Sequence, residues 1–198
     1  METEIEAKFL EINVNLVRKK IKSLNAKLIH PERLMVRKVF DYPDERLEKV
    51  GGWIRVRNEC DKITMSYKQL NNRTLHGTKE ITLTVDDFDK AYAFLLLIGL
   101  KQKAYQETKR EKWVLDNCEI TIDTWPWIPT FVEIEGPNEE SVKDVVKKSG
   151  LDWSKAMFGS VETAYQNYFN VTEKEVDNWE SITFIPTPDW LEEKRIKE

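Results

Sequence analysis

The first residues of the chain alternate between ionisable and apolar side chains. In an extended strand successive side chains point to opposite faces, so Glu4, Glu6 and Lys8 are expected to share one face. Three later segments show the same alternation: residues 53–57, 64–68 and 131–135. Such faces can all lie in water on a flat sheet, or they can point inward if the sheet closes into a barrel. The barrel arrangement would create a charged cavity.

Apolar spacing predicts helices between the extended segments. The expected helices cover about residues 14–25, 88–98, 139–149, 160–170 and 172–179. The expected strands cover about residues 4–10, 28–29, 34–42, 53–58, 63–69, 77–85, 102–115, 119–124 and 131–135. The strongly apolar helix over 88–98 is expected to lie in the core. Together these elements predict an α+β fold: a closed eight-stranded antiparallel β-barrel, or tunnel, with helices packed on its outside.

The length and composition favour one domain. The chain has 198 residues, of which 40% are hydrophobic and 33% charged, which is long enough for one well-buried domain and short for two. We expect a single domain over residues 1–198, with a core over about 1–170 and a C-terminal helix and tail over about 171–198. The segment Trp125-Pro126-Trp127 predicts a rigid, irregular crossing between two strands.

Charge and cysteine content exclude several classes of protein. The 31 basic and 35 acidic residues give a formal net charge of −4, which does not favour nonspecific binding to nucleic acid or membranes. No apolar run approaches the roughly 18 residues of a membrane span, and the acidic N-terminus does not resemble a leader, so we expect a cytoplasmic protein. The pattern leaves a monomer and a homodimer equally open. Cys60, Cys118, His30 and His76 do not have the spacing of a disulfide framework or zinc site, so a bound metal would need oxygen ligands.

The ordered set of charged residues resembles a known family. Glu4-x-Glu6-x-Lys8 is similar to the ExExK signature of the CYTH superfamily, the triphosphate tunnel metalloenzymes. The following residues occur in the order expected for that family: Arg55-x-Arg57, Ser66-Tyr67-Lys68, Glu80, Arg110 followed by Trp113, Asp123, and Glu133-Ile134-Glu135. ExExK alone is a weak signal, whereas the ordered set covers most of the chain. The family includes class IV adenylyl cyclases, thiamine triphosphatases, inorganic triphosphatases and fungal-type RNA triphosphatases, so the resemblance implies an eight-stranded tunnel that binds triphosphates.

The residue types fit that chemistry. Guanidinium and ammonium groups bind phosphate, and the candidate residues that supply them are Lys8, Arg55, Arg57, Lys68 and Arg110. The resemblance adds Glu80 to the candidate substrate-binding residues. Carboxylates bind Mg²⁺ or Mn²⁺, and the candidate metal ligands are Glu4, Glu6, Glu133 and Glu135. The resemblance implies that the catalytic residues are Glu4, Glu6, Lys8 and Asp123.

Three functions follow from these residues. The first is metal-dependent hydrolysis of inorganic triphosphate or a small organic triphosphate, including thiamine triphosphate. The second is class IV adenylyl cyclase activity, which converts ATP to cyclic AMP and pyrophosphate. The third is a noncatalytic module that binds triphosphate or polyphosphate, which would not need the carboxylates.

One departure weakens the cyclase interpretation. The resembling cyclases place a Lys two residues before the Arg that corresponds to Arg110, and this chain has Thr108 there. Lys109 would point to the opposite face of a regular strand, although a one-residue bulge would restore the charge. Trp125-Pro126-Trp127 also replaces the turn usual in those enzymes.

Overall fold

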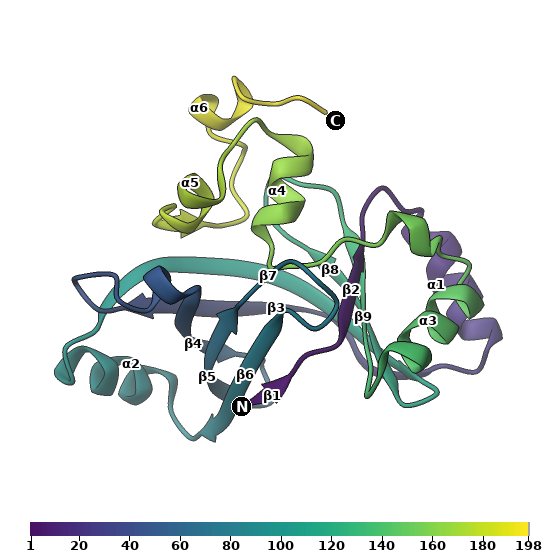
Figure 1. Ribbon diagram of the computed structural model, residues 1–198, viewed down its shortest axis with the longest axis horizontal. Helices are drawn as coiled ribbons and strands as arrows, with labels where there is room; N and C mark the ends of the chain where they lie inside the picture. Colours follow the sequence, from purple (N-terminus) through teal and green to yellow (C-terminus); the bar gives the residue numbers. More distant parts are fainter. Residues whose placement is uncertain (198) are drawn as a thin grey trace.

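One large curled sheet forms the centre of the fold. The computed structural model describes residues 1–197 and shows an α+β architecture (Figure 1). The strands of the sheet follow each other in space as β1 (Glu2–Thr3), β6 (Thr78–Val85), β5 (Ile63–Leu70), β4 (Gly52–Asn58), β3 (Lys27–Asp41), β7 (Lys101–Leu115), β8 (Cys118–Thr124), β9 (Phe131–Glu135) and β2 (Glu6–Phe9). These neighbours are all antiparallel, and the short strand β10 (Ser181–Ile182) pairs with β7 in parallel.

The N-terminal segment contacts both edges of this sheet. Strand β1 pairs with β6 and strand β2 pairs with β9, although Glu4 and Ile5 alone separate β1 from β2 in sequence. The backbone N–H of Glu4 donates to the carbonyl of Thr78 at 3.0 Å, and the N–H of Gly136 donates to the carbonyl of Ile5 at 3.1 Å. The predicted continuous first strand and regular eight-stranded closure therefore differ from the structure. Strand pairing is interrupted because the chain leaves the ladder with β6 before it joins the ladder with β9.

Strand β3 is longer than the sequence pattern predicted. Two strands were expected on either side of Pro31, but a single strand runs from Lys27 to Asp41. The pairing with β7 shifts register between Leu28 and His30 and again between His30 and Arg33. These irregularities place Pro31 where its missing N–H does not break the strand.

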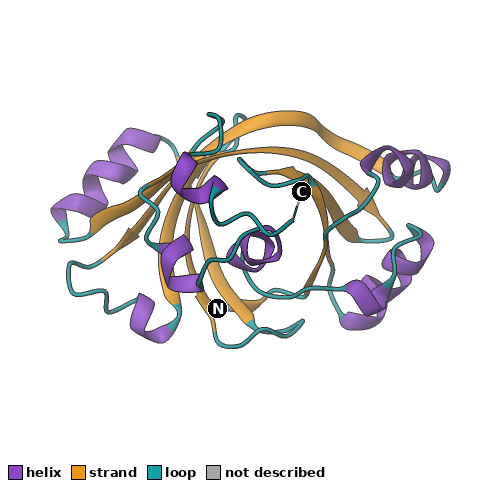
Figure 2. Cartoon of the chain, turned by 90° about the horizontal axis from the view of Figure 1, so that it is seen from above, coloured by secondary structure: helices purple, strands orange, loops and turns teal. Residues whose placement is uncertain are grey.

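The helices cover the outside and one open side of the sheet. They are α1 (Val14–Ser23), α2 (Phe88–Leu97), α3 (Glu139–Lys148), α4 (Glu162–Tyr168), α5 (Glu173–Asp177) and α6 (Asp189–Glu192), with short 3₁₀ turns at Glu48–Val50 and Trp153–Lys155. Helices α1 and α3 lie together at one end and α2 lies at the other, while α4, α5 and α6 lie above the sheet (Figure 1). Figure 2 looks from the side of α4–α6 and shows the strands curving around the centre of the molecule. Among residues 1–197, no helix is long and apolar enough to span a membrane.

The predicted helix starts are confirmed by their capping contacts. The side chains of Asn13 and Asn138 accept hydrogen bonds from the backbone N–H of Leu16 and Ser141, at 3.1 and 2.9 Å. Such bonds satisfy N–H groups that have no partner within the first helical turn. Helices α1 and α3 therefore begin where the sequence indicated.

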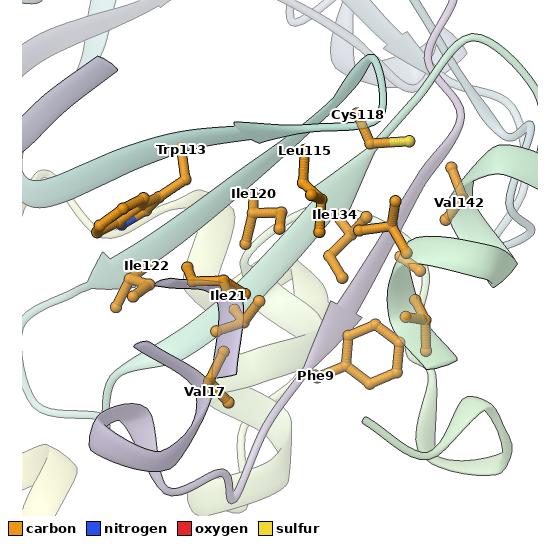
Figure 3. Packing of buried hydrophobic residues seen from close by; sticks show 14 of the residues in the cluster. Phe9, Val17, Ile21, Trp113, Leu115, Cys118, Ile120, Ile122, Ile134 and Val142 are labelled. Atoms are coloured by element: carbon orange, nitrogen blue, oxygen red, sulfur yellow. The ribbon is translucent and has the colours of Figure 1, made fainter. Parts of the chain in front are cut away.

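The largest hydrophobic cluster lies between the helices α1 and α3 and the outer face of the sheet (Figure 3). Its buried members include Phe9, Ile21, Ile120, Ile134 and Val142. Apolar side chains of the strands thus point outward to these helices, and the opposite face of the same strands carries the charged residues.

Helix α2 is not the core helix that its composition predicted. Ala91 and Leu95 are its buried residues, whereas Phe94 is 56% exposed and Leu97 is 86% exposed. The helix packs on the sheet along one stripe only, so the apolar residues on its other side remain in contact with solvent. The number of apolar residues in a helix does not by itself determine how many of its faces are covered.

Candidate active site

A cavity of about 760 Å³ brings the predicted substrate-binding and metal-binding residues together. Its lining includes Glu4, Glu6, Lys8, Arg55, Arg57, Lys68, Glu80, Arg110, Glu133 and Glu135. These residues come from β2, β4, β5, β6, β7 and β9 and from the Glu4–Ile5 link, and they occupy the inner face of the curled sheet. The alternation seen in the sequence therefore produces one charged cavity, as the inward arrangement predicted.

Lys8 lies at the centre of an ion-pair network. Its side chain is 2% exposed, and its Nζ lies 2.6 Å from Oε1 of Glu133 and 3.5 Å from Oε1 of Glu6. Burial opposes the charged form of Lys8, but Glu133 and Glu6 outweigh this effect and raise its pKa. Lys8 therefore stays protonated and can neutralise an anion in the cavity.

Asp123 holds Arg110 from the neighbouring strand β8. The Nε and Nη2 atoms of Arg110 donate to the two carboxylate oxygens of Asp123 at 2.5 and 2.8 Å, and Nη2 also donates to Glu133 at 2.9 Å. The hydroxyl of Thr121 donates to Asp123 at 2.7 Å. Asp123 is 1% exposed and is not a lining residue, unlike the other predicted site residues. Its position is that of a residue that orients the Arg110 guanidinium.

Glu6 and Glu135 form the part of the cavity where negative charge exceeds its compensation, since Glu6 has only a 3.5 Å contact with Lys8. Burial and the neighbouring Glu133 raise the pKa of Glu6 to about 7, and burial and Glu6 raise the pKa of Glu135 to about 8. Within residues 1–197, Glu135 makes no ion pair or side-chain hydrogen bond. A carboxylate pair of this kind is stabilised by either a proton or a cation.

The four predicted metal ligands do not form a ready-made metal site. In the described part of the chain, no group of three or more His, Cys, Asp or Glu side chains is arranged to hold a metal ion. Glu4 is occupied by the Nζ of Lys68 at 2.6 Å, and Glu133 is occupied by Lys8 and Arg110. The oxygen donors themselves suit Mg²⁺ or Mn²⁺, and the facing carboxylates of Glu6 and Glu135, of which only Glu6 has a basic contact, fit a divalent cation.

The basic wall of the cavity combines paired and unpaired cations. Arg57 donates to Oε1 of Glu59 at 3.0 and 2.6 Å. Lys68 contacts Glu80 at 3.4 Å in addition to its bond with Glu4. Arg55 is 9% exposed, and its Nε has no hydrogen-bond partner. Burial and the charge of Arg57 lower the pKa of Arg55 to about 9, and the charges of Glu80 and Glu4 only partly oppose this effect.

Arg37 is a cavity residue that the sequence pattern did not identify. It lies on β3, lines the cavity and is 6% exposed. Arg37 and Lys38 are adjacent, so charge alternation gave no indication of which one faces inward. The structure shows Lys38 over the ring of Tyr92 at 3.6 Å and Arg37 over the ring of Trp125 at 4.6 Å. Register in the sheet, rather than the local sequence, separates the two cations.

The C-terminal helices also contribute to the cavity, which the sequence did not predict. Their lining residues include Glu162, Glu173, Lys174, Val176 and Asp177. A contact between the tail and the sheet is not visible in a local pattern, because it depends on the path of the chain after α3.

Strand β7 has no bulge that turns Lys109 toward the cavity, so Lys109 does not replace the Lys that the resembling cyclases have at the position of Thr108. Thr108, Lys109 and Arg110 pair in unbroken register with Met35, Leu34 and Arg33 of β3, and the nearest register shift lies beyond Arg33, toward His30. The Nζ of Lys109 lies 5.0 Å from the ring centre of Phe184, and Thr108 is fully buried and absent from the lining. Neither residue supplies a positive charge to the cavity.

Comparison with known proteins relates this geometry to a family. The chain is similar in structure to a Pyrococcus horikoshii protein, with 22% identity, 77% of this chain and 93% of that chain covered, and a TM-score of 0.64. A Vibrio parahaemolyticus protein described as an adenylate cyclase candidate has 14% identity, covers 83% of this chain and 98% of its own, and has a TM-score of 0.72. An adenylyl cyclase candidate from Hippeastrum, described as having a dominant triphosphatase activity, has 14% identity, coverage of 89% and 95%, and a TM-score of 0.54.

At these identities the solved structures establish a shared fold alone. No curated protein matches the chain significantly. The family model of the CYTH domain matches residues 2–171, which include every residue that carries the predicted charge pattern. This chain therefore belongs to the CYTH domain family.

Proposed function

We propose that the protein is a divalent-metal-dependent hydrolase of inorganic triphosphate or of a small organic triphosphate such as thiamine triphosphate. The observation that carries this proposal is the division of one cavity into a basic wall with an unpaired Arg55 and an acidic wall with an unpaired Glu135 beside a weakly paired Glu6. A phosphate chain and a divalent cation have complementary charges to these two walls. The family match supports the same substrate class.

The basic residues would bind the phosphate chain. Arg55 and Arg57 can each offer two N–H groups to phosphate oxygens, and Lys68 can act as a point charge. Arg110 is held rigidly by Asp123, so its remaining N–H groups have a fixed direction. Rigid donors aimed at phosphate oxygens stabilise the charge that develops when the bond to the leaving group breaks.

The acidic residues would hold Mg²⁺ or Mn²⁺ and orient water. Glu6 and Glu135 are the ligands available at once, and Glu4 and Glu133 could join them by exchanging their Lys and Arg partners. A bound divalent cation polarises nonbridging phosphate oxygens. One carboxylate of this group would orient the attacking water and accept its proton. The water oxygen then bonds to the terminal phosphorus, and the shortened phosphate chain leaves.

The proposed substrate path is a tunnel through the curled sheet. The N-terminal segment pairs with β6 through β1 and with β9 through β2, so it would close the side of the cavity that lies between these strands. This arrangement would exclude water from the bound phosphates and strengthen each ionic contact.

Adenylyl cyclase activity is the second candidate because the cavity exceeds the size of a bare triphosphate. Its volume of about 760 Å³ leaves space for an organic group such as a nucleoside. Cyclisation would require the ribose 3′-hydroxyl to attack the α-phosphorus, with pyrophosphate leaving. The absence of a positive charge at Thr108 and the outward position of Lys109 favour hydrolysis instead.

One experiment separates these functions. The purified protein is incubated with inorganic triphosphate, thiamine triphosphate or ATP, each with Mg²⁺, Mn²⁺ or chelator, and the products are identified by mass. We expect phosphate release from triphosphate or thiamine triphosphate that requires metal. Cyclic AMP and pyrophosphate from ATP, with inert triphosphate, would establish the cyclase. Tight binding of triphosphate without any product would establish the noncatalytic module.

A further inference from the structure

The arginine side chains that line the cavity differ in whether the protein itself neutralises them. Three of them have a carboxylate partner within 3 Å: Arg33 with Asp61, Arg57 with Glu59 and Arg110 with Asp123. Arg37 and Arg55 have no carboxylate at ion-pairing distance in the described part of the chain. These two guanidinium groups therefore carry the positive charge that remains available to a ligand.

The sheet places Arg37 directly beside other cations. In the ladder between β3 and β4, Arg37 is opposite Arg57, and the next inward pair is Val39 and Arg55. Like charges directly opposite each other destabilise a sheet, and burial increases this effect. Burial, Arg55, Arg57 and Arg110 all lower the pKa of Arg37. This clustering of guanidinium groups is unfavourable in the ligand-free protein. It is explained if an anion binds between Arg37, Arg55 and Arg57 and neutralises their charge.

The Arg37 side chain is also held in one orientation. Its Nη2 donates to the hydroxyl of Thr108 at 2.8 Å, and its guanidinium lies 4.6 Å from the ring centre of Trp125. The Nε of Arg37 is buried and has no hydrogen-bond partner, and the same is true of the Nε of Arg55. Buried polar groups are nearly always satisfied, so two unsatisfied Nε groups on one cavity indicate a missing ligand.

We infer that Arg37 is a phosphate-binding residue and that Arg37 and Arg55 together form an anchor for the phosphate chain that does not require metal. A guanidinium binds phosphate through two parallel N–H···O bonds, and Arg37 and Arg55 both have unused donors. The other three cavity arginines, and Lys8 and Lys68, must first weaken a bond to a protein carboxylate. This inference rests on the proposed substrate class, and it assigns Thr108 and Trp125 as positioning residues for Arg37.

Binding in the absence of metal tests the anchor directly. Inorganic triphosphate is titrated calorimetrically, with chelator present, into the full-length protein and into Arg37→Gln, Arg37→Lys and Thr108→Val. The control is Arg18→Gln, which removes the same charge from a residue that pairs with Glu111 and does not line the cavity. We expect Arg37→Gln to weaken binding by about tenfold or more, because a charged hydrogen bond is lost.

The other variants distinguish binding from a structural role. Arg37→Lys keeps the charge and loses the planar pair of donors, so it is expected to recover part of the affinity. Thr108→Val keeps Arg37 and removes its hydroxyl partner, so it should weaken binding less than Arg37→Gln. Arg18→Gln should bind within twofold of the unmodified protein. If Arg37→Gln does not fold, Arg37→Lys and Thr108→Val still provide the comparison.

Melting temperatures supply a second measurement. Arg37→Gln without ligand should melt at or above the temperature of the unmodified protein, because an uncompensated charge is removed from beside Arg57. Its stabilisation by triphosphate should be smaller, since ligand stabilisation follows affinity. A loss of affinity below threefold for both Arg37 variants would overturn the inference, as would a failure of the unmodified protein to bind triphosphate with chelator present.

Failure of this inference is distinguishable from failure of the proposed function. Phosphate release by the unmodified protein with Mg²⁺ or Mn²⁺ is measured on the same preparation. Hydrolysis together with unchanged binding by the Arg37 variants would retain the hydrolase and reject the anchor. Binding that depends on Arg37 without hydrolysis would retain the anchor and reject the hydrolase.

Discussion

Glu6 and Glu135 are directly opposite each other in the ladder between β2 and β9, and both line the same cavity. Burial and the charge of Glu133 raise the pKa of Glu6 to about 7, and burial and the charge of Glu6 raise the pKa of Glu135 to about 8. Two facing carboxylates with little compensation are unfavourable in the metal-free protein. A proton or a divalent cation relieves the repulsion, so metal binding, stability and pH are expected to be coupled at this pair.

The first prediction concerns Glu6→Gln. Without metal, this variant should unfold at a temperature equal to or higher than that of the unmodified protein, because one repelling charge is removed. Its activity should fall by orders of magnitude, and Mn²⁺ should raise its melting temperature less, because a ligand is lost. Calorimetric melting with and without Mn²⁺ measures both effects.

A matched control for Glu6→Gln is Glu32→Gln, since Glu32 lies on an exposed position of β3. The same chemical change there should leave activity and the Mn²⁺ response unaltered, because exposed charges contribute about 0–1 kcal/mol. A Glu6→Gln protein with full activity and an unchanged Mn²⁺ shift would remove Glu6 from the proposed metal site.

The second prediction is a pH dependence of the metal-free protein. Glu135 binds a proton more tightly in the folded state than in the unfolded state, so ionisation destabilises the fold. This destabilisation is absent below the ordinary glutamate pKa of about 4.5, develops as pH rises, and is complete above the folded pKa of about 8. Each such carboxylate changes the free energy of unfolding by at most about 1.4 kcal/mol per pH unit.

Urea unfolding at several pH values between 5 and 9, with chelator present, tests the pH prediction. The free energy of unfolding of Glu135→Gln, relative to the unmodified protein, should increase as pH rises through this range. The difference between the two proteins isolates Glu135 from the other titrating groups. Parallel pH curves for both proteins would show that the Glu135 carboxyl group is not perturbed by folding.

The third prediction concerns Asp123→Asn. The change removes the charge that compensates Arg110 and places an amide against the guanidinium, so it should lower the free energy of unfolding by about 3 kcal/mol. Activity should also fall, because the direction of Arg110 is no longer fixed. Thr121→Val is the milder companion: it removes one hydrogen bond to Asp123 and leaves the ion pair intact. In urea unfolding, Asp123→Asn should lose more stability than Thr121→Val. Equal stability of Asp123→Asn and the unmodified protein would contradict the buried ion pair.

The fourth prediction tests the two faces of α2. Leu95 is 3% exposed, so Leu95→Ala should lower the free energy of unfolding by about 2–5 kcal/mol through loss of packing and a residual cavity. Leu97 is 86% exposed, so Leu97→Ala should change it by less than about 0.5 kcal/mol. Chemical unfolding of both variants measures the difference. A similar decrease in the free energy of unfolding for both variants would show that both faces of α2 are buried, as its composition suggested.

The sequence alone identified the charged face and the family. Period-two alternation assigns side chains to a strand face without knowledge of the fold, which is why the charged residues of β2, β4, β5 and β9 were all correctly expected to share a cavity. The starts of α1 and α3 were also predicted, because Asn13 and Asn138 each cap a helix within a single helical turn. These features depend on neighbours a few residues apart.

Tertiary structure decided which charges are paired. Asp123 has the alternation of a lining residue, yet it does not line the cavity, because the register of β7 and β8 sets it opposite Arg110, which binds both of its carboxylate oxygens. Arg37 lies inside and Lys38 outside for a similar reason, since their separation depends on the β3 register. The exposed side of α2 and the change of partner at Glu4 and Ile5 depend on which distant segments arrive beside them. Ion pairing and burial are set by contacts between segments far apart in the chain, and a local pattern of charge carries no information about those contacts.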